Sequence, residues 1–328
     1  MTTLVTGATG FTGSHLTRTL VRRGERVRVL LRPSSAEGEL KGLDVEVVKG
    51  DIRDALAVEQ SMRGVDVVYH LAACFREAGA KDSVYHEVHV EGTRNILQAA
   101  CKHGVSRVVH CSTGGVHGHI ANPPANENAP LKPGDIYQET KLQGEQLAFA
   151  FYEREKLPVV VVRPTGIYGP GDLRMLKFYQ LVQRRRFIML GAGRALYHFT
   201  YISDLIDGFL LAAKNETAVG QAYLIGGEKY LTLSEWVKML AKELGVPPPR
   251  YRLPVGPVYA LAAVCETVCP PLGIAPPLFR RRVDIFTKDR AFDITKAHRE
   301  LNFRPQIDLE TGIHRTAEWY KEQGYLRP

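Results

Sequence analysis

Short apolar runs alternate with longer stretches of helical periodicity through the first half of the chain. The runs, rich in valine, leucine and isoleucine, fall at residues 4–5, 27–31, 45–48, 65–70, 105–111 and 159–162. Intervening segments at about 11–23, 84–103 and 137–155 repeat apolar residues at the spacing of a buried helical face. Strands that alternate with helices are typical of right-handed βαβ units. The pattern therefore predicts an α/β fold whose parallel sheet is covered on both faces.

The alternation loosens after about residue 172. Helical patterns at about 173–184, 203–213, 232–244 and 308–322 are separated by short strands and proline-rich turns. We therefore expect two parts: a sheet domain at 1–172, to which some later segments return, and a smaller, mostly helical region at 173–328.

Three glycines lie between the first apolar run and the first helical pattern, spaced G-x-x-G-x-x-G. The segment contains Gly7, Thr9, Gly10, Phe11, Thr12 and Gly13. Glycines at these places permit a tight turn, close approach of the backbone to a phosphate, and close packing of strand and helix. Because a strand precedes and a helix follows, we predict that this turn binds the pyrophosphate of a dinucleotide.

The end of the second strand is where a dinucleotide fold contacts the adenosine ribose. Sites for NAD usually place an acid there, but this chain has Arg32, followed by Pro33, Ser34 and Ser35. A guanidinium and hydroxyl groups suit a 2′-phosphate. We therefore expect NADP(H) in preference to NAD(H).

A tyrosine and a lysine stand four residues apart at the start of the predicted helix 137–155. Tyr137 and Lys141 therefore share one helical face. A free tyrosine titrates near ~10, and a nearby ammonium lowers that pKa toward the range useful for proton transfer. Thr113 follows the strand at 105–111, at the edge where open α/β sheets bind ligands.

This combination resembles the extended short-chain dehydrogenase/reductase superfamily, over essentially the whole chain. The resemblance implies a Rossmann-type doubly wound sheet at 1–172, an NAD(P) cofactor, and a substrate-binding region at 173–328. It implies that Thr113 hydrogen-bonds the substrate oxygen, that Tyr137 transfers a proton, and that Lys141 tunes Tyr137 and holds the nicotinamide ribose. Further cofactor contacts are implied at Asp51, Ile52, Leu71, Ala72, Ala73, Pro164 and Thr165.

Two catalytic branches of this superfamily remain open. The segment 163–170 resembles that of 3β-hydroxysteroid dehydrogenases and dihydroflavonol reductases, which implies an oxidoreductase acting on a secondary hydroxyl or ketone of a small or lipophilic substrate. The alternative is a nucleotide-sugar 4-epimerase or dehydratase, whose Asn and Arg side chains contact the diphosphate. Gly166 and Tyr197 stand in those places here, although Arg194 could substitute. A non-catalytic cofactor sensor is disfavoured because the triad is retained.

Composition and charge limit the kinds of ligand and partner that we expect. The 43 Lys and Arg against 35 Asp and Glu give a formal net charge of +8, which favours anionic ligands. The basic residues are mostly scattered and lack interleaved aromatics, so we expect no nucleic-acid binding. Five irregularly spaced cysteines and the lack of a signal peptide predict reduced thiols in a cytoplasmic protein without a metal site.

Two further expectations concern assembly. The resemblance implies a homodimer formed through the helices at 84–103 and 137–155. The apolar stretch 255–269 is shorter than the ~20 residues that span a bilayer, and Glu266 interrupts it. It could cover the cleft as a lid, contact a membrane beside Arg280–Arg282, or pack as an ordinary helix.

Overall fold

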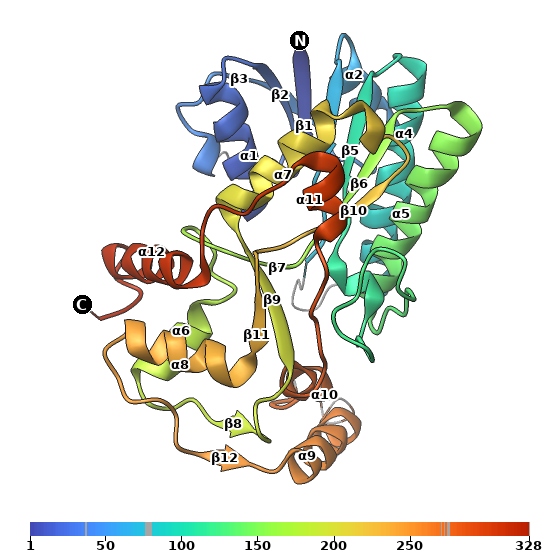
Figure 1. Ribbon diagram of the computed structural model, residues 1–328. Coiled ribbons are helices and arrows are strands. Elements are labelled where there is room, and N and C mark those ends of the chain that lie inside the picture. Colours follow the sequence, from blue (N-terminus) through green and yellow to red (C-terminus); the bar gives the residue numbers. More distant parts are fainter. Residues whose placement is uncertain (37, 76–80, 270, 272, 274–275, 328) are drawn as a thin grey trace.

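A seven-stranded parallel sheet forms the upper half of the molecule in Figure 1. The computed structural model describes residues 1–328 except 37, 76–80, 270, 272, 274–275 and 328. The strand order is β10-β6-β5-β4-β1-β2-β3, and each neighbouring pair is parallel. The strands are β1 (Thr2–Thr6), β2 (Arg26–Leu31), β3 (Val45–Lys49), β4 (Val67–His70), β5 (Arg107–Cys111), β6 (Val159–Pro164) and β10 (Ala222–Ile225). The predicted Rossmann-type fold is confirmed.

Helices cover both faces of this sheet because successive strand residues point to opposite sides. In β1, Leu4 belongs to one buried cluster and Val5 to the other. The cluster of Val5 includes residues of α1 (Phe11–Arg22) and α7 (Ile202–Lys214). The cluster of Leu4 includes residues of α2 (Ala55–Met62), α4 (Gly92–Lys102) and α5 (Ile136–Glu155).

The lower part of the molecule in Figure 1 contains two small sheets, of order β11-β9-β7 and β12-β8, with helices around them. Its elements are β7 (Gly166–Tyr168), α6 (Leu176–Gln183), β8 (Met189–Leu190), β9 (Leu196–Tyr201), β11 (Tyr230–Thr232), α8 (Leu233–Glu243), β12 (Arg252–Leu253), α9 (Val255–Val268), α10 (Arg280–Val283) and α12 (Leu309–Glu322). Short 3-10 turns lie at Gly38–Leu40, Gly114–His117, Glu216–Ala218 and Asp284–Phe286. The later elements α7, β10 and α11 (Thr295–Leu301) pack on or within the large sheet. A boundary after residue 172 stays a prediction.

The predicted helix at 84–103 contains a change of helical pitch. It comprises α3 (Asp82–His86), a π-helical turn at Glu87–Glu91 and α4 in direct succession. The π turn buries His89 and Val90. Such turns are rare and frequently occur at functional sites. The pairing of two copies through this helix and α5 stays a prediction.

The sheet topology determines where a ligand can bind. From β1 the chain adds β2 and β3 on one side, then returns to place β4, β5 and β6 on the other side. The strand order therefore reverses between β1 and β4, and open α/β sheets bind ligands beyond the carboxyl ends of the strands at such a point.

Candidate active site

A cavity of about 1120 Å³ opens beyond the carboxyl ends of β1, β4, β5 and β6. It is lined by most of the residues predicted from the sequence: Gly7, Gly10, Phe11, Thr12, Gly13, Leu71, Ala73, Thr113, Tyr137, Lys141, Pro164 and Thr165. The predicted residues Thr9, Arg32, Asp51, Ile52 and Ala72 are not among the described residues that line it. Residues of α6, β9 and α8 form the opposite wall, so the cavity separates the large sheet from the lower region.

The glycine turn allows β1, α1 and the segment after β4 to approach one another more closely than side chains would permit. Gly7 has a φ of +72°, and a Cβ there would lie 2.7 Å from the backbone nitrogen of Ala72. A Cβ at Gly13 would lie 2.1 Å from the carbonyl oxygen of Gly7. Helix α1 has Gly10 as its N-cap, without a side-chain cap and without an acid in the first turn. Its first amide groups can therefore bind an anion, and this arrangement fits a dinucleotide pyrophosphate.

Asp51, which the family resemblance implies as a contact of the cofactor's adenine, is held by an arginine that the sequence analysis missed. Arg53 donates from Nε to Oδ1 of Asp51 at 3.0 Å and from Nη2 to Oδ2 at 2.9 Å, and it also binds Glu87 at 3.0 Å. Burial opposes ionisation of Asp51, but these bonds and the charges of Arg53 and Arg32 lower its pKa. Both carboxylate oxygens are thus engaged, and an adenine amino group would have to share them. The spacing Asp-x-Arg in the sequence could have indicated this contact between Asp51 and Arg53.

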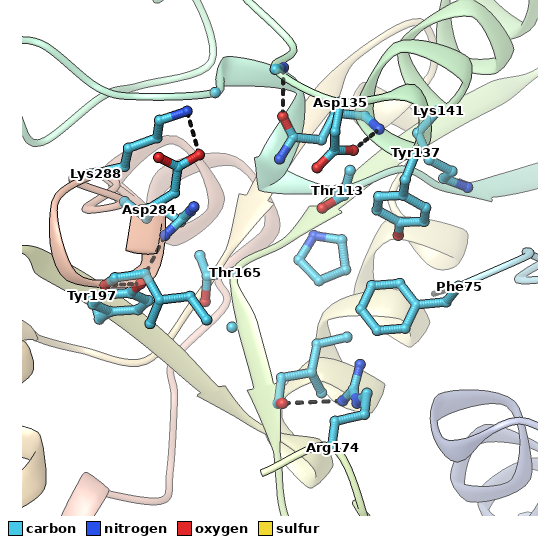
Figure 2. A pocket seen from close by; sticks show the side chains of 18 of the residues that line it. Phe75, Thr113, Asp135, Tyr137, Lys141, Thr165, Arg174, Tyr197, Asp284 and Lys288 are labelled. Carbon is cyan, nitrogen blue, oxygen red and sulfur yellow. Dashed lines mark hydrogen bonds and ion pairs between the residues drawn. The ribbon is translucent and has the colours of Figure 1, made fainter. Parts of the chain in front are cut away.

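Thr113 and Tyr137 begin two elements at the same edge of the cavity. The hydroxyl of Thr113 accepts a hydrogen bond from Gly115 N at 3.0 Å and so caps the short turn after β5. Asp135 caps α5 by accepting from Gln138 N at 2.9 Å, which places Tyr137 in the first turn of the helix. In Figure 2 the Tyr137 hydroxyl points into the cavity.

Two aromatic rings flank the ring of Tyr137. Phe75 packs against it edge to face at 5.1 Å between centroids, and His89 does so at 5.5 Å. His89 Nε2 accepts from Cys74 N at 3.0 Å, and its Nδ1 lies 2.8 Å from Thr140 Oγ1. These hydrogen bonds fix the imidazole between the loop after β4 and α5. His89 therefore positions Tyr137, a role that its place in an apolar helix pattern did not reveal.

Lys141 connects α5 to the strand that ends before Thr113. Its side chain is buried, and Nζ donates to the carbonyl oxygen of Cys111. Burial lowers the pKa of Lys141, while Cys111 and Glu145 act in the opposite direction. Glu145 lies one turn further along α5 and accepts from Arg163 Nε at 3.1 Å. Helix α5 is thus attached to β5 and β6 by buried polar contacts next to the cavity.

Three buried histidines, His70, His89 and His110, lie near Lys141 and form what we call the histidine cluster. His70 bonds Thr6 Oγ1 through Nδ1 at 2.8 Å and Thr93 Oγ1 through Nε2 at 3.0 Å. The rings of His70 and His110 lie 5.4 Å apart. Burial, with the nearby charge of Lys141, lowers the pKa of His70 to about 3 and of His89 to about 2. The cluster is therefore neutral near pH 7.

The wall opposite the glycine turn is a run of aromatic rings. Tyr197 stacks on Phe199 at 5.8 Å and an interplanar angle of 17°, and Phe199 stacks on Trp236 at 5.0 Å and 26°. Phe178 meets Trp236 edge to face at 5.2 Å. All four residues line the cavity. They come from α6, β9 and α8, so this wall presents an aromatic surface that no single sequence segment encodes.

Several cations that line the outer cavity are paired with carboxylates. The pairs are Arg174–Asp172 at 2.7 Å, Arg280–Glu266 at 2.6 Å and Lys288–Asp284 at 2.8 Å. Figure 2 shows the last of these near Tyr197. Arg290 donates to the hydroxyl of Tyr197 at 2.8 Å. The three ion pairs reduce the positive charge that the cavity offers to a ligand.

Three positions bear on the choice between the two catalytic branches: Gly166, Tyr197 and Arg194. A Cβ at Gly166 would lie 3.0 Å from the Phe199 ring and 3.1 Å from the carbonyl oxygen of His198, so an asparagine would not fit there without a shift. Tyr197 donates its hydroxyl hydrogen to Ile285 O at 2.6 Å. Arg194 is exposed and is not among the described residues that line the cavity.

Comparisons with known proteins agree with this geometry. The family model described as "NAD dependent epimerase/dehydratase family" matches residues 3–226. The 2-alkyl-3-oxoalkanoate reductase of Stenotrophomonas maltophilia is 32% identical over 96% of this chain and 98% of its own length.

Two further similar proteins have names that describe different activities. The 3beta-hydroxysteroid-dehydrogenase/decarboxylase isoform 2 of Arabidopsis thaliana is 30% identical over 96% of this chain, which spans 61% of that relative's length. The crystal structure of dTDP-glucose 4,6-dehydratase from Streptomyces venezuelae with NAD bound superposes with a TM-score of 0.79, at 30% identity, over 100% of this chain and 99% of that one.

Proposed function

Because the chain belongs to the NAD-dependent epimerase/dehydratase family and is an enzyme of the extended short-chain dehydrogenase/reductase type, we propose that it interconverts a secondary hydroxyl and a ketone on a lipophilic substrate. The observation that carries the proposal is the stacked wall of Tyr197, Phe199 and Trp236. Such a wall favours an apolar molecule, since burial of apolar area drives binding in pockets of this kind.

The triad has a distinct task for each residue in this proposal. The Tyr137 hydroxyl donates a proton to the substrate oxygen during reduction and accepts it during oxidation. Thr113 donates a hydrogen bond to the same oxygen and orients it. The ammonium of Lys141, held at the end of β5, favours the phenolate of Tyr137 and so assists the proton transfer.

The nicotinamide cofactor, when bound, supplies or accepts the hydride at the substrate carbon. On the protein side, the glycine turn, Leu71 and Ala73 would hold its pyrophosphate half, and Pro164 and Thr165 would lie beside its nicotinamide half. The buried Lys141 ammonium would hold the nicotinamide ribose at the same edge.

The names of two relatives support a ketone or alcohol substrate, since one is an oxoalkanoate reductase and the other a hydroxysteroid dehydrogenase/decarboxylase. The likeness to dTDP-glucose 4,6-dehydratase supports the alternative, a nucleotide-sugar epimerase or dehydratase. Two observations favour the ketone or alcohol substrate. Phe199 crowds Gly166, and cations of the outer cavity are paired with carboxylates.

Thermal unfolding in the presence of NADP(H) distinguishes these alternatives. We expect sterol-like or aromatic ketones to raise the melting temperature and to be turned over, because they bury apolar surface against the aromatic wall. UDP-, GDP- and dTDP-sugars should leave it unchanged. Stabilisation by a nucleotide sugar that is lost in Arg194→Ala, but kept in the exposed control Arg186→Ala, would replace the proposal by the epimerase alternative.

For the cofactor we propose NADP(H) over NAD(H), on the basis of the exposed Arg32 at the end of β2. Charge-assisted hydrogen bonds to a 2′-phosphate contribute about 1.5–3 kcal/mol, so Arg32→Asp should weaken NADPH binding by at least about tenfold. NADH binding should change little. Isothermal titration with both cofactors measures this, and Arg26→Asp, at the other end of β2, is the matched control. Equal affinity of the native protein for both cofactors would contradict the assignment.

A further inference from the structure

Exposed apolar side chains are concentrated in one short segment of the lower region. Of the 13 large hydrophobic residues that are exposed in the described part of the chain, six lie between residues 251 and 268. These six are Tyr251, Leu253, Tyr259, Leu261, Val264 and Val268. Exposed apolar side chains that gather in one segment point to an interaction surface.

Helix α9 presents three of these six residues, Leu261, Val264 and Val268, as a single stripe. Pro257, Leu261, Val264 and Val268 follow a spacing of four, three and four residues, which places them on one helical face. All four are exposed. On α9 only Ala262 is buried, in a small cluster with Leu190 and Val283. The predicted alternative of ordinary packing therefore does not account for the outer face of the helix.

The charge around this stripe is strongly positive. Between residues 250 and 283 the sequence contains five arginines and one acid, Glu266. That acid is paired with Arg280 at 2.6 Å, whereas Arg250, Arg252 and Arg282 are exposed. Basic residues that flank an exposed apolar helix complement the negative surface potential of anionic lipids.

The opposite face of α9 borders the cavity. Tyr259 and Glu266 of α9 line the cavity, as does Arg280 of α10. Figure 1 shows β12, α9 and α10 together at the end of the molecule farthest from the seven-stranded sheet. Among the described residues, no helix combines the length and apolarity needed to cross a membrane.

We propose that α9 docks on the surface of membranes that contain anionic lipids. Leu261, Val264 and Val268 enter the boundary between headgroups and acyl chains, and Arg250 and Arg252 bind lipid phosphates. This proposal goes beyond the proposed function and does not depend on the identity of the substrate.

Sedimentation with lipid vesicles tests the proposal on the full chain without cofactor or substrate. The native protein should sediment with vesicles of phosphatidylcholine and phosphatidylglycerol, less with phosphatidylcholine alone, and less at high salt. The double variant Leu261→Glu/Val264→Glu should bind at least about tenfold more weakly, because two charges would enter the apolar boundary. Arg250→Gln and Arg252→Gln should each weaken binding by about fivefold.

The control is Leu56→Glu, which adds a charge at an exposed leucine on α2, far along the chain from the stripe. Its vesicle binding and melting temperature should equal those of the native protein, and the α9 variants should keep the native melting temperature. Failure of the native protein to sediment with any vesicle would overturn the proposal. So would a concentration-dependent dimer that the α9 variants dissociate, since the stripe would then bind a second copy.

Discussion

The Tyr137→Phe variant should fold normally and bind the nicotinamide cofactor, yet lose about 10²- to 10⁴-fold in kcat. The substitution removes only the hydroxyl that donates the proton, and leaves the ring between Phe75 and His89 in place. Steady-state kinetics on a ketone identified by the thermal screen gives kcat, and titration of the cofactor gives its affinity.

The matched control for this variant lies on the same helix. Tyr152 is half-buried on α5 and is not among the residues that line the cavity, so Tyr152→Phe should keep native kcat. If Tyr137→Phe retained kcat within about threefold of the native value, the proposal that Tyr137 transfers the proton would be wrong. The cofactor site would stand, because the glycine turn does not depend on this hydroxyl.

The free energy of unfolding should fall steeply as the pH decreases from about 6.5 toward about 4. Burial lowers the pKa of His70 to about 3, of His89 to about 2 and of His117 to about 4, and it lowers that of His110 well below its usual value. Their pKa in the unfolded chain is about 6.5. Below that pH the unfolded chain binds protons that the folded chain excludes, so stability present above pH 6.5 is lost as the pH falls.

Each of these histidines should contribute about 1.4 kcal/mol per pH unit within this window. Because a folded domain is stable by only about 5–15 kcal/mol, four such groups should bring unfolding into mildly acidic solution. Urea unfolding followed by circular dichroism at a series of pH values measures the slope. A free energy of unfolding that stayed constant from about pH 6.5 to 4.5 would show that these histidines are protonated in the folded protein.

Two variants of the histidine cluster distinguish the effect of protonation on stability from the effect of hydrogen bonding. Neither ring nitrogen of His110 has a hydrogen-bond partner among the described residues. His110→Leu should therefore be neutral or stabilising at pH 7 and should reduce the acid slope by about one proton. His70→Leu should reduce the slope equally but cost about 1–3 kcal/mol at pH 7, because His70 bonds the hydroxyls of Thr6 and Thr93. Equal stability of the two variants at pH 7 would contradict this distinction.

The sequence by itself determined the features that depend on neighbours along the chain. The turn from Gly7 to Gly13 follows from the need for positive φ and for close packing, which only glycine meets at these positions. The pairing of Tyr137 with Lys141 on one face follows from helical geometry. The alternation of apolar runs with helical patterns was sufficient for the parallel sheet, since βαβ units have few alternative arrangements.

Only the tertiary structure decided what surrounds those features, because contacts between distant segments depend on how the elements pack. His89 packs against Tyr137 through a π-helical turn that periodicity alone does not reveal. Phe199 and Trp236 stack from separate elements to form the aromatic wall of the cavity. The apolar residues of α9 carried no information on their own exposure, since an apolar helix can be buried or can face outward. Packing leaves its outer stripe in solvent, and so distinguishes an interaction surface from a core.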